Sequence, residues 1–441
     1  MIEITTRPGE LRRVLGAFLG AAIVVGGTIG VGILRTPGIV AGELGQPALI
    51  LAVWLAGGLL AAMGASCYAE LATALPRAGG PYVYARRAFG DFAGFAVGWG
   101  DWSVSVCGLA LIALPTGEFA GEFIPAAAGH SHPIAVAAIL VLALLNWFGL
   151  NLSANVQQFL SLAKVAGLLV IVVGGLAFAQ PGSAIDSPLH SLAAPLVFAF
   201  TPLMSAMQLV SETYAGWNSN VYFAEEDHDA HRNVPRALFW GIFAITATYL
   251  AVNAALLFAL PFDTLVASPL PVAEAARVLF GGASDRVVTL LAIVSLLGIL
   301  NVTVMFTPRI LFAMGRDRLL PLSLSRLNRS ATPGLALLIC IVPALVLAAG
   351  VPFETVFLMT AFLGVAVNAS VYIAFFALRR REPDLPRPHR AFGYPWLPAL
   401  VTIISLTLLV GFVIANPKPS LYAIAMLAAS YPVYRWLRSR D

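Results

Sequence analysis

The sequence has few charged residues. Asp, Glu, Lys and Arg make up only 11% of its 441 residues, whereas hydrophobic residues make up 59%. A soluble domain carries about 25% charged residues, so this chain has too few polar side chains to cover a water-facing surface. The shortage excludes a soluble globular protein and predicts that hydrocarbon is the solvent for most of the chain.

The sequence also lacks the motifs of several enzyme classes. Its three cysteines all lie within apolar stretches, so they indicate core packing and no disulfide framework. No Walker, G-x-S-x-G or H-E-x-x-H motif is present, and these are the patterns of P-loop ATPases, α/β-hydrolases and zinc proteases. We therefore expect no enzyme activity, no use of ATP, and no metal or cofactor.

Long apolar runs fill most of the chain. A membrane-spanning helix needs about 20 apolar residues, and no linker is long enough to separate soluble domains. The sequence therefore predicts one all-α, polytopic membrane domain over residues 1–441. It predicts about twelve spans, at 14–41, 47–75, 91–123, 133–150, 155–179, 192–224, 235–260, 285–314, 334–350, 353–378, 395–415 and 419–436.

Basic residues are unevenly divided between the loops. With the N-terminus placed in the cytoplasm, 21 of the 26 basic residues lie on the cytoplasmic face, four lie outside, and Lys164 lies within a span. The positive-inside rule then predicts that both termini are cytoplasmic. This bias accounts for the basic pI, so we expect no nucleic-acid partner. Usage rich in Ala and Arg but poor in Lys suggests a bacterial protein, and hence the cytoplasmic (inner) membrane.

The first span cannot form a regular helix. Four glycines, Gly26, Gly27, Gly30 and Gly32, fall within seven residues, and Pro37 follows. Each glycine costs a helix about 1 kcal/mol relative to alanine, and irregular backbone at membrane depth is tolerated only where it lines an enclosed cavity. The N–H groups that follow Gly30 could bind a substrate carboxylate. The alternative is that these glycines only allow helices to pack closely.

A second weak point lies five spans later, in the segment SETYAGWNSN. There a carboxylate, Glu212, precedes the pair Ala215–Gly216. Two interrupted spans in corresponding places of two halves are typical of transporters built from inverted repeats. Carbonyl groups freed in both spans could accept hydrogen bonds from the ammonium group of a substrate.

Four segments resemble a known family. They are IGVGIL (Ile29 to Leu34), YAELATALPRAGGPYVYARRAFG (Tyr68 to Gly90), YAGWNSNVYFAEE (Tyr214 to Glu226) and, after it, RNVPRA. Over nearly its whole length the chain resembles the amino acid–polyamine–organocation (APC) superfamily. The similarity is greatest to the branch of the L-type amino acid transporters and the bacterial serine/threonine exchanger.

The resemblance implies a LeuT-like fold that works by alternating access. Ten helices would form two inverted repeats of five, at about 14–180 and 192–378, and two further helices would follow at about 395–436. Helices 1 and 6 would be unwound at the substrate site. Animal L-type carriers join a partner subunit through a cysteine in an outer loop, and this chain has none there, so we expect no disulfide-linked accessory subunit.

The resemblance also implies a substrate site at the two breaks. Val31 and Gly32 would offer N–H groups to the substrate carboxylate, and the Thr28 carbonyl would face its ammonium group. Val31 stands where many relatives have a hydroxyl residue, and Glu212 stands where L-type relatives have a gating aromatic. The complete expected site is Thr28, Ile29, Gly30, Val31, Gly32, Glu212, Thr213, Ala215, Gly216, Trp217 and Asn218.

Four charged residues need separate interpretation. Lys164 is about ten residues into a span, which makes it a functional candidate. The resemblance implies that its ammonium takes the place of a coupling sodium ion. The alternative is a lysine that snorkels to the membrane interface. We expect Asp101 at the membrane interface. Glu225 and Glu226 match an acidic pair that would bind loop arginines at the inner gate.

Glu212 leaves three possibilities open. As a buried carboxylate it could exchange a proton and couple transport to a proton gradient. It could instead attract a cationic side chain of the substrate, or pair with a donor in a structural role.

We therefore expect a secondary transporter of neutral L-amino acids that works by sodium-independent exchange or uptake. The alternative is a proton-coupled symporter, possible substrates being cationic amino acids or polyamines. A sensor that binds substrate without transporting it is the candidate outside this class. A channel is not favoured, since no repeated selectivity filter is visible.

Overall fold

The computed structural model describes residues 11, 13, 15–177, 199–281, 284–350 and 353–439. Within these ranges the regular structure is helical, and one isolated β-bridge joins Leu15 to Asp227. The first part of the chain forms α1 (Ala17–Thr28), α2 (Val31–Leu44), α3 (Pro47–Ala74), α4 (Pro81–Phe89), α5 (Asp91–Phe123), η1 (Pro125–Ala127), α6 (Ser131–Trp147) and α7 (Leu150–Ala177).

The second part begins after the undescribed residues 178–198, which include the end of one predicted span and the start of the next. It forms α8 (Phe200–Thr213), η2 (Ser219–Glu226), α9 (Ala230–Ala259), α10 (Phe262–Ala267), α11 (Pro271–Phe280), α12 (Ser284–Arg316), η3 (Leu322–Ser325), α13 (Gly334–Gly350), α14 (Phe353–Arg381), α15 (Trp396–Ala415), α16 (Pro417–Ala428) and α17 (Ser430–Arg438).

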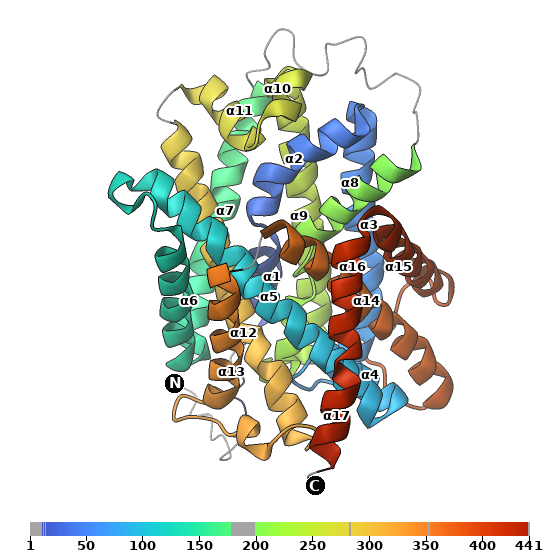
Figure 1. Ribbon diagram of the computed structural model, residues 1–441. Coiled ribbons are helices and arrows are strands. Elements are labelled where there is room, and N and C mark those ends of the chain that lie inside the picture. The colour runs from blue at the N-terminus through green and yellow to red at the C-terminus, as the bar shows by residue number, and fades with distance from the viewer. Residues whose placement is uncertain are drawn as a thin grey trace.

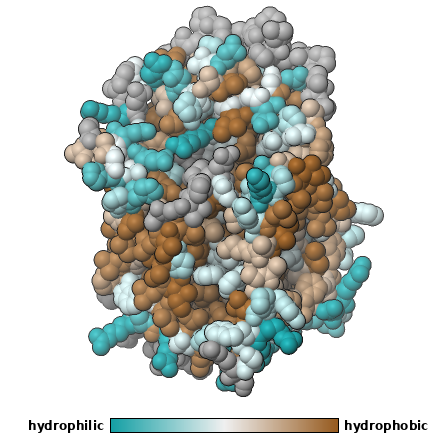
Figure 2. Space-filling view, viewed as in Figure 1, coloured by the Kyte–Doolittle hydropathy of each residue, from teal (hydrophilic) through white to brown (hydrophobic). Residues whose placement is uncertain are grey.

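Seven of these helices, α3, α5, α7, α9, α12, α14 and α15, are long and apolar enough to cross a membrane. The pair α1 and α2 reaches the same length and apolarity together, but it bends by 48° at its break. The helices α6 and α13 are apolar but shorter. Figure 2 shows apolar side chains around the middle of the molecule and hydrophilic ones at its two ends. The prediction of an all-α, polytopic membrane protein is therefore confirmed, while the number of twelve spans stays a prediction.

One end of the bundle, the upper end in Figure 1, is covered by α10 and α11. The sequence predicted a short helix from Val272 to Phe280, and α11 occupies Pro271–Phe280. The preceding helix α10 lies directly on α2, because a Cβ atom added to Gly38 would come within 2.6 Å of the Leu265 carbonyl oxygen. The two short helices thus rest on the second half of the broken span.

The opposite end, which carries α4 and α17 in Figure 1, is held together by ion pairs. Arg316 contacts Glu225 at 2.7 Å, and Arg309 pairs with Glu226 with both side chains buried. The predicted acidic pair therefore binds arginines of α12 and not of a loop. The backbone carbonyl of Glu226 also accepts a hydrogen bond from the backbone N–H of Leu15, at 3.0 Å. The start of α1, the end of η2 and the end of α12 consequently meet here.

Asp317, just after α12, extends this set of ion pairs to α4. It contacts Arg77 at 2.9 Å and Arg86 at 2.7 Å. Burial alone would raise the pKa of Asp317, but the bond from Arg77 and the nearby arginine charges hold that pKa below its ordinary value. Arg438 of α17 reaches Asp91, which also binds Arg86. Both ends of the described chain therefore lie at this end of the bundle.

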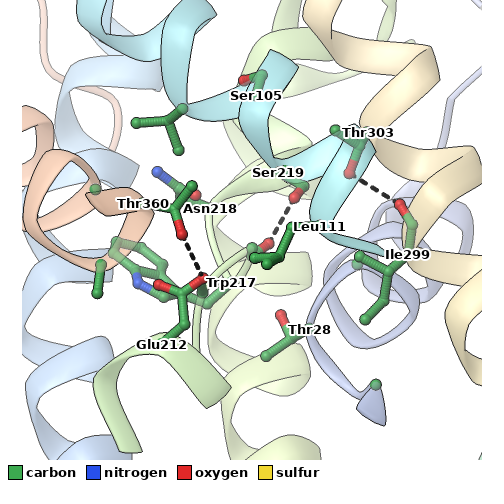
Figure 3. Close-up of a pocket in the computed structure, with 18 of the residues that line it drawn as sticks. Thr28, Ser105, Leu111, Glu212, Trp217, Asn218, Ser219, Ile299, Thr303 and Thr360 are labelled. Carbon is green, nitrogen blue, oxygen red and sulfur yellow. Dashed lines mark hydrogen bonds between the residues drawn. The ribbon is translucent and has the colours of Figure 1, made fainter. Parts of the chain in front are cut away.

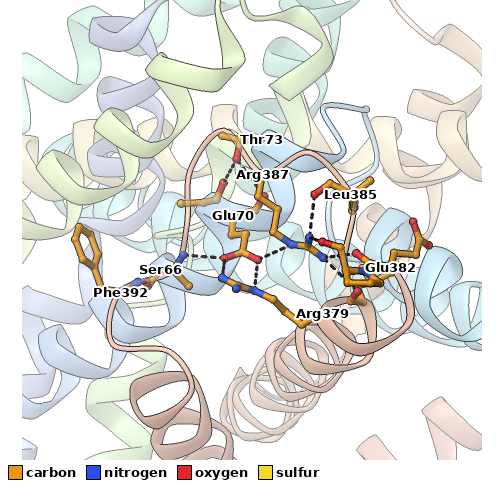
Figure 4. Close-up of polar contacts among 12 residues, drawn as sticks. Ser66, Glu70, Thr73, Arg379, Glu382, Leu385, Arg387 and Phe392 are labelled. Atoms are coloured by element: carbon orange, nitrogen blue, oxygen red, sulfur yellow. Dashed lines mark hydrogen bonds and ion pairs between the residues drawn. The ribbon is translucent and has the colours of Figure 1, made fainter.

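Glu70 fixes the connection between α14 and α15 onto α3 (Figure 4). Its carboxylate is 1% exposed and pairs with Arg379, at the end of α14, and with Arg387, in the connection. It also accepts a hydrogen bond from the Ala391 backbone at 2.8 Å. One buried anion thus has two cationic partners and one amide donor, a combination that satisfies most of its acceptor sites.

Replacing Glu70 by glutamine should destabilise the protein, because Arg379 and Arg387, whose side chains are 18% and 8% exposed, would lose their buried counter-charge. Breaking a buried pair by removing one partner costs about 3–5 kcal/mol. Glu382→Gln is the matched control, since its ion pair with Arg87 is largely exposed and such pairs contribute about 0–1 kcal/mol. Thermal unfolding of both purified variants in one detergent measures the difference. Equal unfolding midpoints would show that Glu70 is not a structural anchor.

Candidate functional site

The first break separates α1 from α2. The helix α1 ends at Thr28, Ile29 and Gly30 take extended backbone conformations, and α2 begins at Val31. The break therefore falls within the glycine-rich segment that the sequence singled out. The first N–H groups of α2 have no partner within the helix, and Gly30 caps that helix without a side-chain bond.

The second break follows α8. This helix ends at Thr213, and the chain turns through Gly216, whose φ of +96° lies in the left-handed region. The chain then continues as the 3-10 helix η2 and not as an α-helix. Ser219 stabilises the turn, because its backbone N–H and its hydroxyl both donate to the Gly216 carbonyl, at 3.0 and 2.6 Å.

The two breaks touch each other. A Cβ atom added to Gly216 would lie 2.4 Å from the Gly27 carbonyl oxygen, and one added to Gly32 would lie 2.9 Å from Thr213 Cγ2. Close packing also explains Gly26, because an added Cβ atom would lie 1.9 Å from Gln157 Nε2. Both interpretations of the glycines therefore hold in part: they permit the breaks, and they allow neighbouring chains to approach.

Lys164, on α7, reaches the first break. Its side chain is fully buried, and its ammonium donates to the carbonyls of Gly26 at 2.9 Å, Ile29 at 2.7 Å and Ser295 at 3.1 Å. The first two carbonyls belong to the broken span and the third to α12. All three ammonium protons are therefore used, which excludes a lysine that snorkels to the interface.

Tyr249, on α9, joins the two breaks to each other, a role that the sequence analysis did not predict. Its buried hydroxyl lies 3.1 Å from the Thr28 carbonyl and 2.9 Å from the Thr213 carbonyl. A hydroxyl has one proton, so it can donate to only one of these carbonyls at a time. The other carbonyl then keeps free acceptor capacity at the point where the breaks meet.

A cavity of about 240 Å³ lies beside the breaks (Figure 3). Ser105, Thr303 and Thr360 add hydroxyl groups to its wall from α5, α12 and α14. Of the predicted site, Ile29 and Val31 do not line the cavity, and the side chain of Val31 lies outside the described part of the structure. The remaining nine line it: Thr28, Gly30, Gly32, Glu212, Thr213, Ala215, Gly216, Trp217 and Asn218.

Trp217 and Asn218 contact side chains of α3 and α14. Trp217 packs edge-on against Tyr68, with ring centroids 5.1 Å apart. The Tyr68 hydroxyl donates to Asn368 Oδ1 at 2.6 Å, and Asn218 approaches the same oxygen at 3.5 Å. These aromatic and amide contacts fix the turn after Gly216 against two long helices.

Two carboxylates line the cavity. The structure corrects the expected position of Asp101, which is not at the interface: it is 5% exposed and accepts from the Tyr222 hydroxyl at 2.8 and 2.9 Å. The second carboxylate, Glu212, has a contact of 3.4 Å with the Thr360 hydroxyl. That hydroxyl also lies 2.8 Å from the Phe357 carbonyl, so its single proton is better placed there. Among the described residues, no group of three or more potential ligands could hold a metal ion.

Gly216→Ala should destabilise the protein, because alanine would need a left-handed φ and would overlap the Gly27 carbonyl. A backbone conflict of this kind should cost about 3 kcal/mol. Gly108→Ala is the control: Gly108 lines the same cavity, but an added Cβ atom would meet nothing within 4 Å. Thermal unfolding of the two variants tests this contrast, and a Gly216 variant as stable as the control would contradict the close contact between the breaks.

The amino acid permease family model matches residues 15–432. Among curated relatives, the serine/threonine exchanger SteT of Bacillus subtilis is 28% identical over 99% of both chains. The large neutral amino acids transporter small subunit 2 of Oryctolagus cuniculus is 28% identical over 96% of this chain and 80% of its own length. The Asc-type amino acid transporter 1 of Mus musculus is 28% identical over 96% of this chain and 81% of its own. The chain belongs to the amino acid permease family.

Proposed function

We propose that this permease is a secondary carrier that moves amino acids by alternating access and does not need sodium. The predicted inverted repeats, about 14–180 and 192–378, belong to this proposal, as does the placement of both termini in the cytoplasm. In that arrangement the end of the bundle that carries the ion pairs faces the cytoplasm. The helices α10 and α11 then cover the outer side of the cavity.

The cavity at the two breaks supports a zwitterionic substrate. The unpaired N–H groups at the start of α2 suit a carboxylate, because a helix N-terminus combines free donors with a favourable dipole. The carbonyls of Thr28 and Thr213 suit an ammonium group, since Tyr249 can donate to only one of them at a time. Both halves of an amino acid backbone would therefore bind to main-chain groups, which leaves the rest of the cavity for the side chain.

Lys164 is the observation that carries sodium independence. A coupling cation in this fold would sit among carbonyl oxygens of the broken span and α12, and the ammonium of Lys164 already binds carbonyls of both. A positive charge at that place repels a second cation. The Lys164 ammonium would therefore take the place of a bound sodium ion and stabilise the break.

Two classes of amino acid are candidate substrates, and they differ in the charge of the side chain. The names of the relatives refer to serine, threonine and large neutral amino acids, and a neutral amino acid is the substrate expected from the resemblance. The two carboxylates of the cavity favour a second candidate, an amino acid with a cationic side chain. Proton coupling through Glu212 remains the alternative to exchange, and a sensor would bind the same substrates without moving them.

The cysteines support a carrier that works without a disulfide-linked subunit. One matched relative is named a small subunit, which implies a partner for that protein. In this chain Cys67, Cys107 and Cys340 are all buried, and the sequence has no other cysteine. No thiol is therefore exposed for a bond to another chain.

Replacing Lys164 by alanine should abolish transport, because two carbonyls of the break and one of α12 would lose their shared donor. We expect uptake into liposomes to fall at least about tenfold, since each buried charged bond contributes about 1.5–3 kcal/mol. Lys418→Ala is the matched control, because Lys418 is the only other lysine and is exposed.

The measurement is exchange of labelled amino acid by purified protein, with and without sodium. Wild-type exchange should be equal in both buffers. Intact uptake by the Lys164 variant, or a strict sodium requirement of the wild type, would contradict the proposal. Failure of the wild-type protein to move any amino acid that it binds would favour the sensor.

A further inference from the structure

The described residues that line the cavity include acidic but no basic side chains. Asp101 and Glu212 line it, whereas none of its described lining residues is lysine, arginine or histidine. Neither carboxylate takes part in an ion pair among the described residues. Two basic residues are buried in the described part of the chain: Lys164 gives its protons to three carbonyls, and Arg309 pairs with Glu226.

Glu212 has acceptor capacity that the described residues do not fill. Within the described part of the chain, its carboxylate has one hydrogen-bond contact, with the Thr360 hydroxyl at 3.4 Å, and that hydroxyl has a closer acceptor in its own helix. A carboxylate enclosed by protein without a donor is unfavourable. A cation supplied by the substrate would satisfy it.

Asp101 also has free acceptor sites. Both of its oxygens lie within 2.9 Å of the Tyr222 hydroxyl, but this hydroxyl supplies only one proton, whereas a carboxylate has about four acceptor positions. The remaining positions face a cavity that Asp101 lines together with Ser105 and Gly108. A second cationic group could therefore bind here.

The two carboxylates lie at opposite ends of the cavity. Glu212 lies beside Thr360 of α14, with which it has its 3.4 Å contact. Asp101 lies farther along α14, near Val367, because a Cβ atom added to the adjacent Gly100 would be 3.5 Å from the Val367 side chain. Seven helical residues separate these two positions by about 10 Å. In Figure 3, Ser105, one turn after Asp101, lies across the cavity from Glu212.

We propose that the cavity selects amino acids with a cationic side chain, such as lysine or ornithine, and that Glu212 and Asp101 bind the two ammonium groups. This inference rests on the proposed function and names its substrate class. The α-ammonium lies near Glu212 and the carbonyls of the breaks, and the side chain extends along α5 and α14. Bonds of about 1.5 Å place the two lysine nitrogens at most about 7 Å apart, and a charged bond of about 2.8 Å at each end spans carboxylates roughly 10–13 Å apart.

The test compares lysine with norleucine, which has the same unbranched four-carbon side chain but ends in a methyl group and carries no side-chain charge. Both are offered as competitors of labelled lysine and labelled norleucine, in binding to purified protein and in exchange by liposomes. Wild-type protein should prefer lysine by about tenfold or more, since a site built for a charged group discriminates strongly against an analogue without it. A preference for norleucine would overturn the proposal.

Two variants separate the roles of the carboxylates. Asp101→Asn should lower the affinity for lysine by about tenfold and change that for norleucine by less than about threefold, because only lysine reaches this end. Glu212→Gln should weaken both ligands, because both have an α-ammonium. Glu122→Gln is the control, on the same helix as Asp101 but exposed and outside the cavity. If Asp101→Asn leaves the preference for lysine unchanged, the assignment is wrong.

The outcomes distinguish this inference from the proposed function. Exchange of norleucine without binding of lysine would overturn the substrate class and leave the carrier intact. Preferred binding of lysine without exchange of either compound would support the substrate class and overturn the carrier. Binding of neither compound would overturn the substrate class.

Discussion

The structure depends on how the peptide groups of two broken spans find partners away from water. A helix that crosses hydrocarbon satisfies its own backbone, and each group freed by a break must be bound by protein or by a ligand. Here Lys164 binds the carbonyls of Gly26 and Ile29, and Tyr249 lies against those of Thr28 and Thr213. Two side chains from α7 and α9 thus stabilise a gap that the sequence of α1 and α2 creates.

The partners are incomplete, and this incompleteness gives the site its chemistry. The amides at the start of α2 have no acceptor in their own helix, and Tyr249 cannot donate to both of its carbonyls at once. The contact of Gly216 with the Gly27 carbonyl brings these unfilled groups to one place. In the proposed carrier, a ligand with both a carboxylate and an ammonium group would complete this hydrogen bonding, and its binding would stabilise the breaks.

The sequence predicted the elements well because their causes are local. Apolar runs of sufficient length predicted the helices. The clustered glycines predicted the break at residues 29–30, and the pair Ala215–Gly216 predicted the break at 214–218. The position of Lys164 on its span was likewise enough to suggest an internal role. The burial of Asp101 was missed because the direction in which a side chain points from its helix depends on rotation about the helix axis, which the sequence does not determine.

Contacts between distant segments could not be predicted for the same reason. Tyr249 and Thr28 are 221 residues apart, and Glu70 and Arg379 are 309 apart. Each pair depends on the relative positions of two helices, which no local pattern determines. The 3-10 conformation of η2 was also unexpected, since its sequence continues the apolar pattern of a helix.

The ion pairs at one end of the bundle would suit the closed state of the proposed carrier. The end beside η2 is held by ion pairs, most of them partly exposed, such as Glu225 with Arg316 and Asp317 with Arg77. The pair of Glu226 with Arg309 is buried, and a buried pair is costly to break only while its charges stay away from water. In the proposed carrier, opening of this end would let water reach both charges and replace the lost contacts. Such a closure would be strong in the closed state and still reversible, as the proposed alternating access requires.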